Sequence, residues 1–288
     1  MTRVELIRLA IVASIFLTVL GIGLSATWRD TTLLLRERGL LFRSLISMFV
    51  AMPVVVAIVA QVSNLPEAVK IALVALAIAP VPPILPRREL QAGGRSGYAV
   101  GLLAVGALIA IVYVPVAVEI LDRVFVRHAA VSPLAIGKIV LVTILAPLLI
   151  GMAVRQWAPS AAAKGAGPVL TIGMILLVVA CIPLLIATWP AIVALFGNGT
   201  VLIMALVAAG GLLLGHALGG PIPEDRIVLA LSTASRHPAV ALAVATSGVM
   251  ETKSELGAIL LYVVVSVLVS LPYVMWRRRR VAVVRGAS

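Results

Sequence analysis

The fold is indicated most clearly by the segment LPEAVKIALVALAIAP (65–80) and by a similar segment, IPEDRIVLALSTASRHP (222–238). Each opens with a Pro-Glu pair typical of a helix start and stays apolar for about three turns. Each then meets a proline where an apolar helix would otherwise continue. The two stretches therefore predict two helices that are interrupted part-way.

The composition around these stretches is that of a membrane protein. Of the 288 residues, 62% are hydrophobic and 12% are charged, whereas soluble domains have roughly 45–50% apolar and about 25% charged residues. The basic residues cluster between apolar segments, so the net charge of +12 does not indicate nucleic acid. Cys181 lies in an apolar run and indicates neither a disulfide nor a thiolate metal site.

Uncharged segments long enough to cross a bilayer predict nine spans in a single domain, 1–288, of all-α class. We place them at 8–27, 42–62, 68–92 (interrupted), 96–118, 132–154, 167–189, 199–220, 225–249 (interrupted) and 255–276. Glycines in the first and seventh spans predict close helix contacts; they are Gly21, Gly23, Gly210, Gly211 and Gly215.

The basic residues also predict how the chain is oriented. One side of the membrane receives fifteen: Arg29, Arg36, Arg38, Arg43, Arg87, Arg88, Arg95, Arg155, Lys164, Arg226, Arg277, Arg278, Arg279, Arg280 and Arg285. The other receives seven: Arg3, Arg8, Lys70, Arg123, Arg127, Lys138 and Lys253. Positive charge favours the cytoplasm, so the N-terminus is expected outside and the C-terminus inside. The arginines that follow Trp276 are typical of a membrane anchor that touches anionic lipid.

The two interrupted segments are the third and eighth predicted spans, so they cross the membrane in opposite senses. Inverted repeats with interrupted helices are the pattern that points to the binding site of a secondary transporter. The alternative is a chance similarity between two short apolar segments.

The first interruption holds Pro80, Pro82, Pro83 and Pro86, followed by Arg88 and Glu89. Prolines at this density predict a helix break that leaves carbonyl groups unpaired at membrane depth. A simple kink is the alternative interpretation.

The second interruption carries Ser232, Thr233, Ser235, Arg236 and His237 before Pro238. A charged residue in mid-membrane is costly and usually marks a pathway or a paired site. If a helix resumes near Pro238, Arg236 and His237 lie at its positive end, which favours an anion-attracting or coupling centre. The alternative is a structural ion pair between Arg236 and Glu89.

Four segments together resemble the bile acid:sodium symporter family and its bacterial relatives. They are GIGLSATWRD (21–30), SLISMFVAMPVV (44–55), SNLPEAVKIALVALAIAP (63–80) and SRHPAVALAVA (235–245). The resemblance implies inverted repeats, two crossing broken helices, and a panel domain beside a core domain. It assigns 8–27, 132–154 and 167–189 to the panel and 42–62, 68–92, 96–118, 199–220, 225–249 and 255–276 to the core. Bacterial relatives often have ten spans, so the nine predicted here imply that this chain is expected to lack the first of them.

The side chains that bind sodium in that family do not carry over. The family's Pro-Gly-Gly-Thr-Ala-Ser-Asn motif reads PVPPILP (80–86) here, and its Glu and Gln-Asn pair are replaced by Ser232 and by Arg236 and His237. Met48 stands where the family has a glutamine. The resemblance therefore implies no sodium coupling at these positions, with Arg236 supplying the missing charge. Proton coupling through His237 or Glu89 is a second hypothesis.

These observations predict a transporter of a small organic solute, an organic anion, in a cell membrane that the bacterial relatives suggest is the inner one. The expected partners are the solute and the lipid bilayer, with no nucleic acid, no cofactor and no metal; the oligomeric state is left open. No HExxH or GxSxG motif occurs, which argues against an enzyme. A membrane sensor that binds a ligand without transporting it is the alternative.

Overall fold

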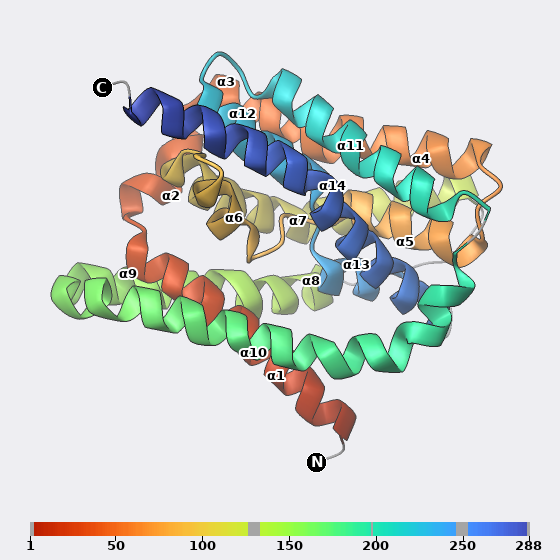
Figure 1. Cartoon of the computed structure of the whole chain (residues 1–288), viewed down its shortest axis with the longest axis horizontal. Coiled ribbons are helices and arrows are strands. Elements are labelled where there is room, and N and C mark those ends of the chain that lie inside the picture. Colours follow the sequence, from red (N-terminus) through yellow and green to blue (C-terminus); the bar gives the residue numbers. More distant parts are fainter. Residues whose placement is uncertain (1–2, 126–132, 197, 246–252, 287–288) are drawn as a thin grey trace.

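The computed structural model describes residues 3–125, 133–196, 198–245 and 253–286, and the regular elements in these ranges are helices (Figure 1). The predicted all-α class is confirmed. Helix is the expected form for long apolar runs, because it pairs the backbone polar groups within the segment, as hydrocarbon requires.

The first two helices meet at a sharp corner. Helix α1 (Arg3–Ser25) is followed by α2 (Trp28–Arg36), with a bend of 87° between them. Thr27 caps α2: its hydroxyl accepts from the Asp30 N–H, and the Asp30 carboxylate accepts from the Thr27 N–H at 2.8 Å. This reciprocal cap fixes the point at which the chain turns.

The next span contains a π-helical turn ahead of a proline. It runs through α3 (Arg38–Leu45), the π turn Ile46–Ala51 and α4 (Met52–Val62). The remaining elements are α5 (Glu67–Ile78), α6 (Leu85–Gln91), α7 (Ser96–Phe125), α8 (Pro133–Val140), a second π turn (Leu141–Leu145), α9 (Ala146–Trp157), α10 (Pro159–Ala194), α11 (Thr200–Leu218), α12 (Pro223–Ala234), α13 (Pro238–Ala245) and α14 (Lys253–Gly286).

Fewer complete crossings are found than the nine predicted. Within the described ranges, six helices are long and apolar enough to cross a membrane, and the bent pair α1–α2 gives a seventh candidate. The predicted spans 68–92 and 225–249 are not confirmed as crossings, because each is divided into two short helices. Part of the second, 246–249, lies outside the described residues.

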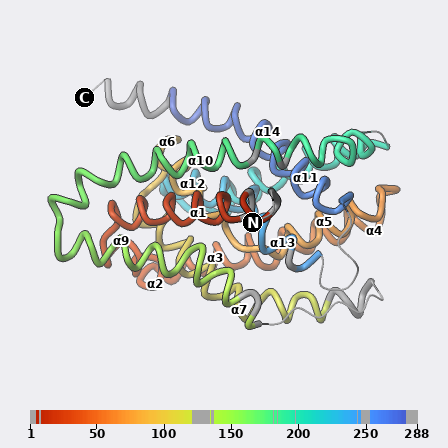
Figure 2. Tube along the Cα trace, turned by 90° about the horizontal axis from the view of Figure 1, so that it is seen from below, coloured from red at the N-terminus to blue at the C-terminus, as the bar shows by residue number. Residues whose placement is uncertain are grey.

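The helices separate into two packed groups. Helix α1 packs against α9 and α10, and these three lie together on the lower side in Figure 1 and towards the viewer in Figure 2. The largest buried apolar cluster joins mainly α4, α5, α7, α11, α12 and α14. The assignment of the helices to a panel domain and a core domain stays a prediction.

Most of the predicted small-residue contacts are found. A Cβ at Gly23 would lie 2.5 Å from the Leu148 carbonyl oxygen of α9, and one at Gly215 would overlap the Leu229 carbonyl of α12. Gly21 faces Leu170 and Gly211 faces Ala234 in the same way. Gly210 was expected to behave similarly, but a Cβ there would meet nothing within 4 Å.

Candidate functional site

The first helix break lies between α5 and α6. The chain leaves the helix at Ala79, which has an extended backbone, and Pro80, Pro82 and Pro83 lie buried in the turn that follows. Pro86 was expected to belong to the break, but it lies in the first turn of α6, where its missing N–H leaves no bond unmade. The break is thus real and is shorter than predicted.

The second break lies between α12 and α13. Ser235 is extended and buried, and a helix resumes at Pro238 as predicted. The His237 N–H donates to the Pro80 carbonyl oxygen at 2.8 Å, so the two breaks are joined directly through the main chain. Helix α5 packs against α13, and α6 packs against α12. The first part of each broken helix therefore contacts the second part of the other.

Arg236 is held between these elements by main-chain oxygens. One terminal nitrogen, Nη2, donates to the Met48 carbonyl at 3.0 Å, and Nη1 donates to the Ala79 carbonyl at 3.3 Å. Only 4% of the residue is exposed. Among the described residues, no carboxylate lies within ion-pair distance of the guanidinium. Arg236 is therefore a buried cation whose contacts are carbonyl dipoles.

Pro53 explains why a carbonyl in an unbroken span is free to meet Arg236. A π-helical bond would join the Met48 carbonyl to residue 53, and an α-helical bond would join the Phe49 carbonyl to the same residue. Proline has no N–H to donate. The Phe49 carbonyl instead accepts from the Tyr113 hydroxyl at 2.7 Å, and the Met48 carbonyl accepts from Arg236.

Glu89 is fully buried beside the same helices, and its partner is Ser232. The Ser232 hydroxyl donates to Oε1 of Glu89 at 2.6 Å. The alternative interpretation, a structural ion pair between Arg236 and Glu89, is wrong, because the guanidinium donates to carbonyl groups and the Glu89 carboxyl accepts from Ser232, one turn before Arg236. Arg236 and Glu89 are thus both buried near the helix breaks, but their hydrogen-bond partners differ.

The remaining predicted residues differ in their placement. Thr233 shares a 2.8 Å hydrogen bond with Ser47, on the π turn beside Met48. The His237 ring is fully buried, and neither ring nitrogen has a hydrogen-bond partner among the described residues. Arg88 does not join the breaks, since its guanidinium donates to Ser270 of α14 at 3.2 Å.

Several groups at the site were not among the residues predicted from the sequence. The Ala79 carbonyl contacts Arg236, and the Tyr262 hydroxyl donates to the Ala234 carbonyl at 3.1 Å. A contact made by a main-chain carbonyl group cannot be predicted from the type of side chain at that position. The Met52-Pro53 pair is the signal that could have indicated free carbonyl groups one turn earlier.

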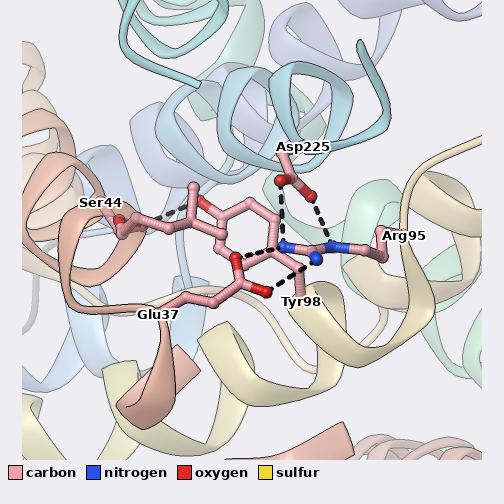
Figure 3. Close-up of polar contacts among 6 residues, drawn as sticks. Glu37, Ser44, Arg95, Tyr98 and Asp225 are labelled. Carbon is pink, nitrogen blue, oxygen red and sulfur yellow. Dashed lines mark hydrogen bonds and ion pairs between the residues drawn. The ribbon is translucent and has the colours of Figure 1, made fainter. Parts of the chain in front are cut away.

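A polar cluster at the start of α12, shown in Figure 3, was also missed. Arg95 donates to both carboxylate oxygens of Glu37, at 2.9 and 2.8 Å, and pairs with Asp225 with an Nε to Oδ1 distance of 2.7 Å. Nearby, the Tyr98 and Ser44 hydroxyls share a 2.8 Å hydrogen bond. The hydrogen bonds and charge of Arg95 hold the pKa of Glu37 below its ordinary value, although partial burial opposes this. The cluster ties α12 to the α2–α3 junction and to the start of α7.

This arrangement of helices can be compared with known families. The sequence profile of the sodium bile acid symporter family matches residues 12–207, which is more than half of the chain. The chain belongs to this family. The predicted resemblance is confirmed, and with several apolar helices long enough to cross a membrane the protein is a transmembrane member of a transporter family. No curated protein matches the chain.

The match to the sodium bile acid symporter family covers one half of the site. The π turn and the first break lie inside residues 12–207, whereas the second break, with Arg236 and His237, lies beyond them. Arg236, the cation at the centre of the site, therefore lies in the part of the chain that the family profile does not match.

Proposed function

We propose that this chain is a secondary transporter of a small organic anion that does not use sodium at the two helix breaks. The contact of the Arg236 guanidinium with the carbonyl groups of Ala79 and Met48 carries the proposal. A sodium ion bound here would need several oxygen ligands. Two of the available carbonyl oxygens already accept hydrogen bonds from the guanidinium. The guanidinium also supplies the positive charge that a sodium ion would bring.

Charge supports an anionic solute. Arginine stays protonated in proteins, so its charge does not leave the site as a dissociating ion would. The described residues supply no carboxylate to neutralise it. The start of α13, just after His237, adds the positive end of a helix. A solute carboxylate that approaches the breaks would be attracted by both.

Transport would use the two packed groups of helices. We take α1, α9 and α10 as one moving body and the helices around the breaks as the other, so that rocking exposes the site to each side in turn. The Arg95 cluster and the main-chain bond between the breaks would keep the second body rigid.

The direct test is uptake by liposomes that contain the purified chain. Radiolabelled organic anions, including a steroidal carboxylate and an aliphatic monocarboxylate, are offered under an inward sodium gradient or an equal potassium gradient. We expect saturable uptake of at least one anion at the same rate in both. Uptake that needs the sodium gradient would overturn the proposal on coupling, and uptake confined to neutral solutes would overturn the charge preference. Binding without uptake would favour a non-transporting sensor.

Substitution at Arg236 links the result to the site. Arg236→Gln is expected to lower anion uptake by about tenfold to a hundredfold, the scale of a lost charge-assisted hydrogen bond. Arg29→Gln, which removes an exposed arginine on α2, is the matched control and should keep normal uptake.

A further inference from the structure

Three arginines from three helices surround the short turn between α11 and α12. The Arg226 Nε donates to the Gly220 carbonyl at 2.6 Å, and the Arg277 Nη2 donates to the Pro223 carbonyl at 3.1 Å. A terminal nitrogen of Arg43 lies 2.6 Å from where a Cβ of Gly220 would be. Segments far apart in the sequence thus place three guanidinium groups on one turn.

These guanidinium groups keep donors to spare. Arg277 is 9% exposed, and its Nε has no hydrogen-bond partner among the described residues. Arg43 is exposed, and within the described structure neither Arg43 nor Arg226 lies within ion-pair distance of a carboxylate. Asp225, the nearest buried acid in sequence, is occupied by Arg95. The turn therefore carries concentrated positive charge, opposed by the exposed Glu224.

An aromatic and apolar surface adjoins the arginines. The guanidinium of Arg277 lies 5.4 Å from the ring centroid of Trp276, which is 41% exposed. Leu268, Leu271 and Met275 are exposed at helical spacing on α14, and Figure 2 shows α14 along an outer edge of the molecule. Tryptophan at this position is typical of the membrane interface.

We propose that this turn binds the phosphate headgroup of an anionic phospholipid in the leaflet predicted to be cytoplasmic. The headgroup phosphate accepts hydrogen bonds from Arg43, Arg226 and Arg277. The acyl chains of the same lipid lie along the exposed apolar face of α14. Because the turn leads directly into α12, the lipid contacts the start of the helix that ends at Ala234, two residues before Arg236. Guanidinium groups bind phosphate more specifically than ammonium groups do, through paired donors in a fixed plane.

Native mass spectrometry of the purified full-length chain tests this, with phosphatidylglycerol and phosphatidylcholine of equal chain length as probes. Phosphatidylglycerol is expected to bind the wild-type chain more tightly and to raise its melting temperature. Arg43→Gln and Arg277→Gln should each weaken that binding by about fivefold. Glu224→Gln removes the opposing charge and should strengthen it.

Arg38→Gln is the matched control, because Arg38 is an exposed arginine predicted on the same side of the membrane. Equal loss in Arg38→Gln and Arg43→Gln would indicate diffuse attraction and would overturn a defined site. Equal binding of the two lipids would also overturn it. Stabilisation by inorganic phosphate alone, to the same degree as by phosphatidylglycerol, would identify a soluble anion in place of a lipid. Arg43 makes no hydrogen bond within the described structure that folding would need, so the test does not depend on Arg277→Gln being stable.

Discussion

At the scale of single residues, the Met48 carbonyl group links Pro53 to Arg236. Pro53 removes a donor and leaves the carbonyl groups of Met48 and Phe49 without helical partners. A carbonyl group left unpaired in the interior costs about 1–3 kcal/mol. Arg236 and Tyr113 supply the missing donors from other helices, so a local defect becomes a tertiary contact.

This pairing predicts that lysine cannot replace Arg236. Arg236→Lys keeps the buried charge but replaces a planar fork, which reaches two carbonyl groups, with a single ammonium group. We expect the free energy of unfolding to fall by about 1.5–3 kcal/mol, the range for a hydrogen bond to a charged group. Melting curves in detergent measure the change, with Arg29→Lys on the exposed face as control. An unchanged melting temperature would contradict the role given to the carbonyl contacts.

Glu89 allows a separate test of proton coupling, which stays a hypothesis. Glu89→Gln keeps an oxygen that accepts from Ser232 and removes the ability to bind and release a proton. The variant should melt within a few degrees of the wild type, whereas uptake driven by an imposed pH gradient should be lost if Glu89 carries the proton. His237→Ala tests the second candidate in the same assay. Normal pH-driven uptake in both variants would exclude the hypothesis.

At the scale of elements, α11 and α12 approach each other closely because Gly215 has no side chain. A methyl group at this position would overlap the Leu229 carbonyl, which belongs to the backbone and cannot swing aside. Gly215→Ala should therefore cost about 1–3 kcal/mol, as overpacking does. Gly210→Ala on the same helix is the control, since a Cβ there meets nothing within 4 Å. Its melting temperature should stay equal or rise, because alanine favours helix over glycine.

The Arg95 cluster predicts a stability that depends on pH. The pKa of Glu37 is lowered from its ordinary value of 4.5, so the carboxylate stabilises the folded state fully above that value. The contribution is lost as the pH falls from 4.5 through the lower pKa of the folded state. Glu37→Gln should flatten the acid side of a plot of melting temperature against pH. Equal slopes in wild type and Glu37→Gln would contradict the assignment.

At the scale of the whole molecule, the proposed loss of sodium coupling should be visible without a substrate. A ligand that binds only the folded state raises the melting temperature as its concentration rises. If Arg236 occupies the cation position, the wild-type chain should melt at the same temperature in sodium chloride and in choline chloride of equal ionic strength. A specific stabilisation by sodium would show that an ion site exists despite the arginine.

The membrane class, the positions of most of the apolar helices and the presence of the two breaks could be predicted from the sequence alone. These features depend on local signals, because hydrophobic runs select helix in a bilayer and proline stops it within a few residues. The resemblance to the family was equally readable from segment order, and the profile match confirmed it.

The contacts of the polar groups, in contrast, became visible only in the three-dimensional packing of the helices. Arg236 bonds a carbonyl 188 residues away, where the side chain is a methionine that gives no sign of it. Charge alone left open an ion pair between Glu89 and Arg236, yet Ser232 is the partner of Glu89. Burial favours a hydrogen bond between any donor and acceptor that pack together, and main-chain oxygens can accept it as well as carboxylates can. Which of them meets a buried charge therefore depends on how the broken helices cross.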